Sequence, residues 1–373
     1  MPTDKPLRIA QIVGNTTLGG VAQCVLNYYR HIDRSKVQFD FFSYGPSYLD
    51  DEIIRLGGRV YYLPNFINFP KAIKELIPIL RRNKYEIVHS HLTTLSVFPL
   101  FAAKRAGVPV RIVHAHSTAG VIGGHAIVKR ILKQFSSVCA THKLACARYS
   151  GQWLYGKNSD YSILYNAIDL DKFTYDAAQR ERIRKKYKID GILVGFAGRM
   201  CYQKNLFFLL DAFEEMLTVR PDAKLMLVGD GEDRPELEKQ VAKKGLRKKV
   251  IFTGQVKDMA QYYNAFDVFV LPSHYEGLPL VGVEAQACGV PCIFSDKITG
   301  EVDIVHGVNM FMPISKKSMW AGSMAAVKEG IDRTGRKPVL AARNFDIALE
   351  SGKLEQFYID CALSAENKDG IAE

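Results

Sequence analysis

Two glutamates are the residues whose type and spacing best suit the binding of a polar ligand. In the segment "HYEGLPLVGVEAQACGVPCIFSD", Glu276 lies in a loop with glycine and proline, and Glu284 follows seven mostly apolar residues later. A carboxylate accepts several hydrogen bonds and is a good partner for hydroxyl groups. Because unpaired acids are rarely buried, the apolar neighbours of Glu284 argue against the alternative of two solvent-facing carboxylates.

The residues between the two glutamates predict the start of a helix. Proline is favoured at the first helical position, where its missing N–H has no partner to lose. We expect Pro279 at this position, after a loop formed by Gly277 and Leu278. The first amides of a helix have no partner inside it. Those of Leu280 and Val281 are therefore predicted to bind phosphate oxygens.

A second loop, "GFAGRMCYQKN", carries two cations between a strand and the start of a helix. There Arg199 and Lys204 can converge on one anion together with free backbone amides, although two solvated loop cations are the alternative. The two segments together suit a nucleoside diphosphate sugar. Glu276 would bind sugar hydroxyls, and Glu284 would accept hydrogen bonds from a ribose diol.

These loops need strands and helices to position them, and the hydrophobic pattern contains two series of both. Short β-branched runs such as "LRIAQIVG" and "EIVHSH" alternate with amphipathic stretches, and a second series begins at "ILVGFAG". This alternation predicts an α/β protein with parallel, doubly wound sheets. Since 373 residues exceed what one core usually serves, we expect Rossmann-like domains over residues 1–168 and 169–345, facing across a cleft.

A terminal helix is predicted over residues 346–365. Its apolar residues recur at helical spacing, so one face should return to the N-terminal domain. These residues are Ile347, Leu349, Leu354, Phe357 and Tyr358.

Charge is distributed unevenly along the chain. The net charge is +11, and residues 1–170 contain 21 Lys+Arg against 10 Asp+Glu, so the whole positive excess lies there. This asymmetry suggests that one domain faces an anionic partner such as phospholipid, lipid pyrophosphate or nucleic acid. The segment 127–135, "IVKRILKQF", predicts a short basic amphipathic helix, which either packs on its own core or binds an anionic membrane surface.

Other signals limit the class of protein. No window has the length of a spanning helix and the start lacks a signal-peptide pattern, so we expect a cytoplasmic protein, peripheral on the inner face of the cell membrane if the basic helix binds lipid. The seven cysteines are odd in number and form no Cys-x-x-Cys pair. Most are therefore interpreted as buried thiols, and neither a disulfide framework nor a zinc site is supported.

In order along the chain, the motifs resemble those of the retaining glycosyltransferases of family 4, which have the GT-B fold. They include "LGGVAQCVLNYYR", "VRIVHAHS", "LYNAIDLDKF", "GRMCYQKN", "LMLVGDGEDRPELE" and the Glu-x7-Glu segment. The resemblance implies that Arg199 and Lys204 bind the donor diphosphate, Glu276 the donor sugar and Glu284 the ribose. No metal and no cofactor are expected. A narrower resemblance to enzymes of capsular or exopolysaccharide assembly suggests a UDP-sugar donor and a glycan or lipid-linked acceptor.

The resemblance also assigns residues in the N-terminal domain. His116 occupies the position of the family histidine beside the transferred sugar, and Gly19 and Gly20 would form an acceptor or donor loop. The chain departs from its relatives at Ala22, where they often carry Glu, and at Met310, where they carry Gly.

Histidines and aspartates elsewhere could suggest a metal site. Two His-x-His pairs occur, His89 with His91 and His114 with His116, but no further ligands stand at an evident spacing. His114 is therefore interpreted as a packed strand residue. The Asp-x-Asp at 169–171 is interpreted as turn and capping chemistry.

Three other functions compete with transfer. A nucleotide-sugar epimerase of the same fold would use a similar nucleotide pocket but needs additional acids and bases. A non-enzymatic binder of anionic lipid or nucleic acid would explain the basic half, yet it leaves the glutamates and the Arg/Lys loop without a role. A dehydrogenase is disfavoured because neither glycine loop reads Gly-x-Gly-x-x-Gly.

Overall fold

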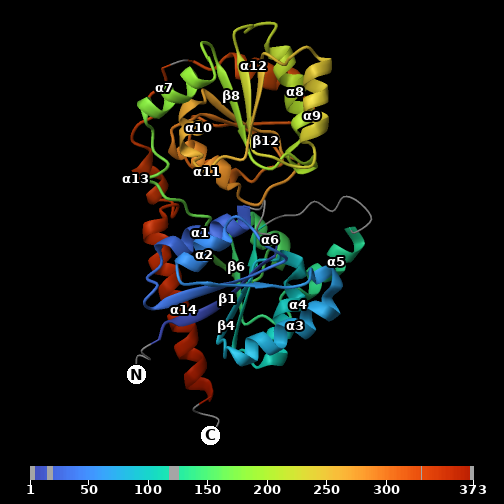
Figure 1. The fold of residues 1–373 in the computed structure, drawn as a ribbon, viewed down its shortest axis with the longest axis vertical. Coiled ribbons are helices and arrows are strands. Elements are labelled where there is room, and N and C mark those ends of the chain that lie inside the picture. Colours follow the sequence, from blue (N-terminus) through green and yellow to red (C-terminus); the bar gives the residue numbers. More distant parts are fainter. Residues whose placement is uncertain (1–4, 15–19, 117–125, 329, 370–373) are drawn as a thin grey trace. The chain divides into compact units, whose positions relative to one another are not determined.

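The chain folds into two compact units, each built on its own parallel sheet (Figure 1). The computed structural model describes residues 5–14, 20–116, 126–328 and 330–369. The first unit comprises Met1–Ala167 with Asp346–Glu373, and the second comprises Ile168–Phe345. No helix in the described ranges combines the length and the apolar character that crossing a membrane requires.

The first unit contains a seven-stranded sheet with the order β3-β2-β1-β4-β5-β6-β7, and every strand pair is parallel. Its strands are β1 (Leu7–Gly14), β2 (Val37–Ser43), β3 (Arg59–Tyr62), β4 (Ile87–Ser90), β5 (Val110–Ala115), β6 (His142–Ala145) and β7 (Ser162–Ile163). Its helices are α1 (Gly20–His31), α2 (Asp50–Arg55), α3 (Phe69–Arg82), α4 (Val97–Ala106), α5 (Ala126–Phe135), α6 (Arg148–Tyr155) and α14 (Ile347–Asp369), with short 3-10 turns η1 (Phe66–Asn68) and η2 (Thr93–Ser96).

Local chemistry sets the ends of several of these elements. Strands β4 and β5 are almost entirely buried, as expected for parallel strands covered on both faces. Helix α3 carries a proline in its first turn, and α4 ends at Gly107, whose φ of +86° is a left-handed conformation that glycine adopts without strain.

Helix α14 belongs to the first unit, as predicted from its apolar pattern. It packs against α1, and Ile347, Leu354 and Tyr358 are buried. The Tyr358 ring meets Phe39 of β2 edge to face at 5.8 Å. Leu349 was expected on the same face but is 58% exposed, because it falls off the stripe that contacts the sheet.

The second unit contains a six-stranded sheet with the order β10-β9-β8-β11-β12-β13, again parallel throughout. Its strands are β8 (Leu193–Ala197), β9 (Lys224–Val228), β10 (Val250–Gly254), β11 (Val268–Leu271), β12 (Cys292–Ser295) and β13 (Met310–Met312). Its helices are α7 (Ala177–Lys186), α8 (Leu206–Met216), α9 (Arg234–Lys243), α10 (Ala260–Ala265), α11 (Leu280–Ala287), α12 (Lys317–Ala325) and α13 (Arg336–Ala341), with 3-10 turns η3 (Tyr202–Lys204) and η4 (Gly300–Val302).

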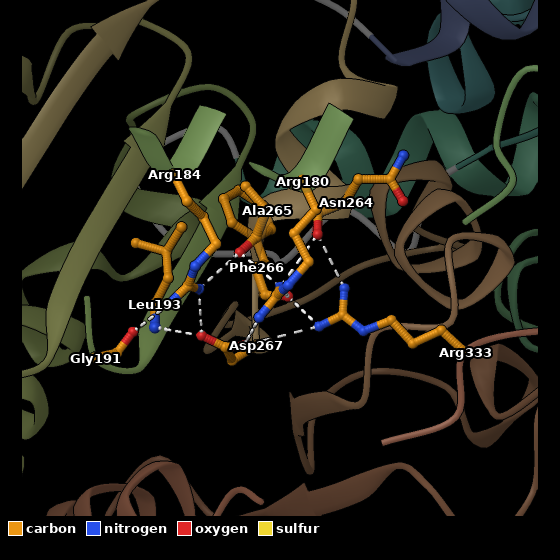
Figure 2. A network of polar contacts seen from close by, with 9 residues as sticks. All are labelled: Arg180, Arg184, Gly191, Leu193, Asn264, Ala265, Phe266, Asp267 and Arg333. Carbon is orange, nitrogen blue, oxygen red and sulfur yellow. Dashed lines mark hydrogen bonds and ion pairs between the residues drawn. The ribbon is translucent and has the colours of Figure 1, made fainter. Parts of the chain in front are cut away.

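A buried carboxylate organises the amino-terminal edge of this second sheet. Asp267 directly precedes β11, and its side chain accepts hydrogen bonds from the backbone N–H of Leu193 (2.7 Å) and from Arg184 (2.8 Å). Arg180 also donates to this carboxylate, and Arg333 lies 3.9 Å from it (Figure 2). The same arginines cap backbone carbonyls at the end of α10. The cluster therefore joins α7, α10 and two central strands.

The electrostatics of Asp267 follow from its neighbours. Burial acts to raise the pKa of its carboxyl, but the charges of Arg180 and Arg184 outweigh burial, so this pKa lies below its usual value. Burial lowers the pKa of Arg333 to about 10. The ionised carboxylate is thus the counter-charge on which three largely buried guanidinium groups depend.

We expect Asp267→Asn to lower the free energy of unfolding of the second unit by about 3–5 kcal/mol at pH 7, because it leaves buried cations without a counter-charge. The folded-state pKa of Asp267 lies below the unfolded value of about 3.9. Its stabilisation is therefore present above about pH 4 and is lost as pH falls through the folded-state value. Urea denaturation of wild type and variant between pH 7 and pH 3 should show that their difference in free energy of unfolding becomes smaller at acid pH.

The matched control is Asp190→Asn, because Asp190 is an exposed acid three residues before the start of β8. It should change stability by less than about 0.5 kcal/mol. Equal stability of the Asp267 and Asp190 variants at pH 7 would contradict the role given to the cluster.

Candidate functional site

The predicted site residues of the second unit gather where its strand order reverses. Strand β8 pairs with β9 on one side and with β11 on the other. In a doubly wound sheet, ligands bind at such a switch point, beside the carboxyl ends of the strands. The loops that leave β8, β9 and β11 all start at this edge.

The loop after β8 is held by close packing of backbone on backbone. The N–H of Met200 donates to the carbonyl of Asp230 (2.9 Å). Gly229 has a φ of +129°, and a Cβ atom there would lie 2.1 Å from the carbonyl oxygen of Gly198. This approach requires glycine and fixes the loop that carries Arg199. The Arg199 guanidinium pairs with Glu232 at 2.9 Å, and both side chains are exposed.

Lys204 and Glu276 form a direct ion pair. Lys204 Nζ donates to Glu276 Oε1 at 2.6 Å, and both side chains are largely buried. Gln203 Nε2 donates to Glu276 Oε2 (3.1 Å) and to the carbonyl of Tyr275 (2.9 Å), while the N–H of His274 donates to the Gln203 carbonyl (2.8 Å). The loops after β8 and β11 are thus joined through the two residues that the sequence assigned to one site.

Helix α11 begins one residue later than predicted. Pro279 is the residue before the helix, with φ −73° and ψ 112°, and Leu280 is the first helical residue. The extended ψ of Pro279 explains the shift, because a first helical residue needs helical dihedrals. The N–H of Gly282 makes the first bond within the helix, to the Pro279 carbonyl at 3.0 Å. The amides of Leu280 and Val281 precede this bond, and the loop residues Gly277 and Leu278 before them are buried.

Glu284 is buried inside α11, with only 8% of its surface exposed. Tyr263 Oη donates to Glu284 Oε2 at 2.8 Å. Burial raises the pKa of Glu284 to about 6, although the bond from Tyr263 and the charge of Lys172 oppose this rise. Glu284 is therefore not a surface carboxylate, as its apolar neighbours in the sequence predicted.

Sequence reasoning did not identify three polar residues at this edge. Gln203 adjoins Lys204 in the same motif, so its position was a signal for the bond to Glu276. Tyr263 gave no signal, because its partner lies 21 residues away. Ser273 follows β11, and its buried Oγ has no hydrogen-bond partner among the described residues.

The first unit gathers its histidines at the corresponding edge. His89 lies on β4 and His91 directly after it, while His114 lies on β5 and His116 directly after it. All four are buried, and His91 Nδ1 lies 2.8 Å from His116 Nε2. Burial lowers the pKa of His116 to about 3, with an opposing effect of Asn166, and holds the pKa values of the other three well below the usual range.

One group of side chains could hold a metal ion among the residues that the structure describes. The ring nitrogens of His89, His91 and His114 all lie within 4.8 Å of one another. In the structure these nitrogens instead hydrogen-bond to one another or to neighbouring polar groups. The absence of metal from the reaction stays a prediction.

Other predicted residues are placed as follows. Gly19 lies outside the described residues, and Gly20 is the first residue of α1. Asp169 accepts from the backbone N–H groups of Asp171 and Lys172 at 3.0 Å, which confirms turn chemistry for the Asp-x-Asp segment. All seven cysteines are free thiols.

The fold matches that of a solved structure. The crystal structure of Anabaena Alr3699/HepE in complex with UDP and glucose superimposes with a TM-score of 0.79 over 94% of this chain and 99% of that chain. Sequence identity is 18%, so this likeness concerns the fold alone. It confirms the predicted GT-B class, with two parallel α/β sheets and a C-terminal helix against α1.

Sequence comparison gives the family. Residues 18–172 match "Glycosyltransferase Family 4" and residues 179–319 match "Glycosyl transferases group 1". EpsF of Bacillus subtilis (strain 168) is 33% identical over 370 residues, covering 94% of this chain and 96% of EpsF. The UDP-Gal:alpha-D-GlcNAc-diphosphoundecaprenol alpha-1,3-galactosyltransferase of Escherichia coli is 29% identical over 318 residues, covering 79% and 80%. The chain belongs to glycosyltransferase family 4, a retaining family, and its substrate is a nucleotide sugar.

We expect Glu284→Gln to stabilise the second unit above pH 7. Because the pKa of Glu284 is raised to about 6, the folded protein holds this proton more tightly than the unfolded chain does. The stability that the proton provides is complete below the unfolded pKa of about 4.3 and is lost as pH rises through the folded value. The substitution should raise the free energy of unfolding by about 1–2 kcal/mol at pH 8 and hardly change it at pH 4.

Chemical denaturation at the two pH values measures this difference. The control is Glu181→Gln, because Glu181 is an exposed acid on α7 that should show no such pH dependence. If Glu284→Gln were no more stable than wild type at pH 8, ionised Glu284 would not destabilise the fold, and the prediction would be wrong.

Proposed function

We propose that this chain transfers a sugar from a UDP-sugar to a glycan or lipid-linked acceptor in surface polysaccharide assembly, with retention of configuration. The observation that carries the proposal is the Lys204–Glu276 pair at the switch point of the second sheet, beside the start of α11. The Escherichia coli relative, whose name specifies a UDP-sugar donor and a lipid-diphosphate-linked acceptor, supports the choice of substrates.

The second unit would hold the nucleotide. Lys204, Arg199 and the N-terminus of α11 would bind the diphosphate and stabilise the charge that develops as it leaves. Glu284 would accept hydrogen bonds from the ribose diol, with Tyr263 holding one of its oxygens at 2.8 Å. Ribose binding would explain why an acid is present at this position, although its burial is unfavourable.

The ion pair suggests how the donor is recognised. Without a ligand, Lys204 and Glu276 neutralise each other at 2.6 Å. A diphosphate that takes Lys204 as its partner frees Glu276 oxygens for the hydroxyl groups of the sugar, since the bond from Gln203 still fixes the carboxylate. Binding of the diphosphate and binding of the sugar of one donor are thereby coupled.

Glu276 of the second unit and His116 of the first unit are each proposed to contact the transferred sugar. We propose that attack occurs on the face from which the diphosphate departs and that the leaving phosphate takes the proton of the acceptor. Among the described residues of the second-unit site, Glu276 and Glu284 are the buried acids, and both have hydrogen-bond partners that suit binding. A role for them in binding leaves no need for a covalent intermediate.

We expect Lys204→Ala and Glu284→Ala to weaken UDP binding by tenfold or more, about the effect of losing one charge-assisted hydrogen bond. Glu276→Ala and His116→Ala should instead chiefly lower kcat, because they contact the sugar that changes charge in the transition state. Calorimetry with UDP and steady-state kinetics with a UDP-sugar separate the two effects.

The control is Lys185→Ala, which removes an exposed lysine at the far end of α7. Unchanged UDP affinity in both the Lys204 and Glu284 variants would refute the donor site.

A second test concerns metal ions. Activity should persist in EDTA, and a complete loss of activity that Mg²⁺ or Mn²⁺ restores would overturn the metal-free mechanism. Release of free sugar without acceptor, with no transfer, would favour the epimerase alternative.

We further propose that the first unit binds an anionic membrane surface through α5. The helix has the predicted basic amphipathic sequence, but its apolar residues face outward: Ile127, Val128, Ile131 and Phe135 are 73, 51, 52 and 50% exposed. Lys133 lies over the Trp153 ring at 4.7 Å, so the opposite side of the helix holds it to the unit. An outward apolar stripe on a basic helix is typical of helices that lie in a membrane interface.

We expect the protein to sediment with anionic liposomes and much less with neutral ones, because each cation near an anionic surface contributes about 1 kcal/mol. Binding should decrease as salt rises, since charges beyond a Debye length of about 10 Å at 0.1 M are screened. Replacing Lys129, Arg130 and Lys133 with Glu should abolish it.

The control carries the same change of charge elsewhere. Arg182, Lys185 and Lys186 are exposed on α7 of the second unit, and their replacement with Glu should leave most binding intact. Equal sedimentation with neutral and anionic liposomes, or equal loss in both triple variants, would remove the membrane role and favour an acceptor in solution.

A further inference from the structure

Six polar side chains form one hydrogen-bonded chain inside the first unit. The Gln11 amide on β1 lies at its centre. Gln11 Nε2 donates to Tyr358 Oη at 3.0 Å, and Gln11 Oε1 lies 2.8 Å from His91 Nε2. The order along the chain is His114, His89, Tyr358, Gln11, His91 and His116.

The Gln11 amide determines which atoms donate and which accept along this chain of hydrogen bonds. A neutral imidazole has one N–H donor and one acceptor nitrogen. Because the Gln11 oxygen can only accept, His91 must carry its proton on Nε2, and its Nδ1 is then an acceptor. His91 Nδ1 lies 2.8 Å from His116 Nε2, so His116 must carry its proton on Nε2. Its Nδ1 is left with a lone pair.

The other arm follows the same rule. The Tyr358 hydroxyl accepts from Gln11, which leaves its own O–H to donate to His89 Nδ1 at 2.7 Å. His89 then carries its proton on Nε2 and donates to His114 Nδ1 at 3.2 Å. The remaining proton of His114 lies on Nε2. The backbone of Leu164 opposes the effect of burial on the pKa of His114, as an oxygen facing an N–H does.

The two ends of the chain are buried and incompletely satisfied. His114 Nε2 and His116 Nδ1 have no hydrogen-bond partner of normal geometry among the described residues, although the Leu164 backbone acts to raise the pKa of His114 and the Asn166 side chain that of His116. Their rings lie 3.9 Å apart, centroid to centroid. Both line a small cavity of about 10 Å³. Buried polar atoms of this kind require a partner, and one N–H beside one lone pair matches a hydroxyl group, which both accepts and donates.

We infer that Gln11 is a positioning residue for sugar transfer: through His91 it fixes His116 in the tautomer that presents an Nδ1 lone pair to a hydroxyl of the sugar. This inference rests on the proposed function, in which His116 contacts the transferred sugar. Gln11 itself touches no substrate. Its amide can face His91 with oxygen only while its nitrogen is bound to Tyr358, so Tyr358 of α14 holds the same tautomer from a distance.

The tautomer can be measured without turnover. In ¹⁵N-histidine-labelled wild-type protein, long-range ¹H–¹⁵N correlation should show one tautomer of His116, with the proton on Nε2. A proton on Nδ1, directed to Asn166, would overturn the inference even if the protein is an active transferase. Conversely, an inactive protein with the expected tautomer would refute the proposed function and leave the network intact.

Gln11→Leu tests the role of the amide. It should give His116 a mixture of tautomers and lower kcat about tenfold, the rate equivalent of one hydrogen bond, with UDP affinity unchanged. The control is Gln38→Leu, since Gln38 lies on neighbouring β2 and bonds to Tyr29 and Arg34 instead. A single Nε2-protonated His116 in Gln11→Leu, or equal effects of both substitutions, would contradict the inference; if Gln11→Leu does not fold, the wild-type spectrum still decides.

Discussion

Parallel pairing of strands is the constraint on which both units depend. Because every pair runs in the same direction, each sheet has one edge where all its strands end, and polar side chains can gather there without interrupting a strand. In the second unit this edge carries Lys204 and Glu276, and in the first it carries His91 and His116. The opposite edge of the second sheet carries Asp267 and its arginines, which stabilise the fold. The proposed binding residues and the stabilising cluster therefore lie at opposite ends of the strands.

Two buried carboxylates of the second unit illustrate this separation. Asp267 and Glu284 are both almost inaccessible to solvent, but their pKa values move in opposite directions. The arginines around Asp267 compensate for its burial. Glu284 has only the Tyr263 hydroxyl and a more distant lysine charge, so burial prevails and raises its pKa to about 6. Because Glu284 accepts fewer hydrogen bonds within the protein than Asp267 does, its burial is less well compensated and the fold is less stable once it ionises.

The sequence predicted those parts of the structure that depend on local pattern. Alternating apolar runs gave both sheets and α14, and the loop motifs brought Lys204 and Glu276 together, because motif spacing and strand direction are local properties. It could not predict the short strands β7 and β13, whose two and three residues are too few to show a period. It also missed Gln11 and Tyr358, whose partnership depends on a contact across 347 residues. The exposure of the apolar stripe on α5 was left open, since a helical pattern does not say which side meets the core.

The position of Tyr358 affects how the protein is made. Synthesis runs from the amino end, so the seven strands of the first unit and then the entire second unit leave the ribosome before α14. Until then Gln11 and His89 lack the phenol that joins them, and the apolar surface under Phe39 is uncovered. The first sheet therefore lacks this cover while the whole second unit is synthesised. Chaperones that shield apolar surface should therefore bind this chain during synthesis of the second unit, before the final helix arrives.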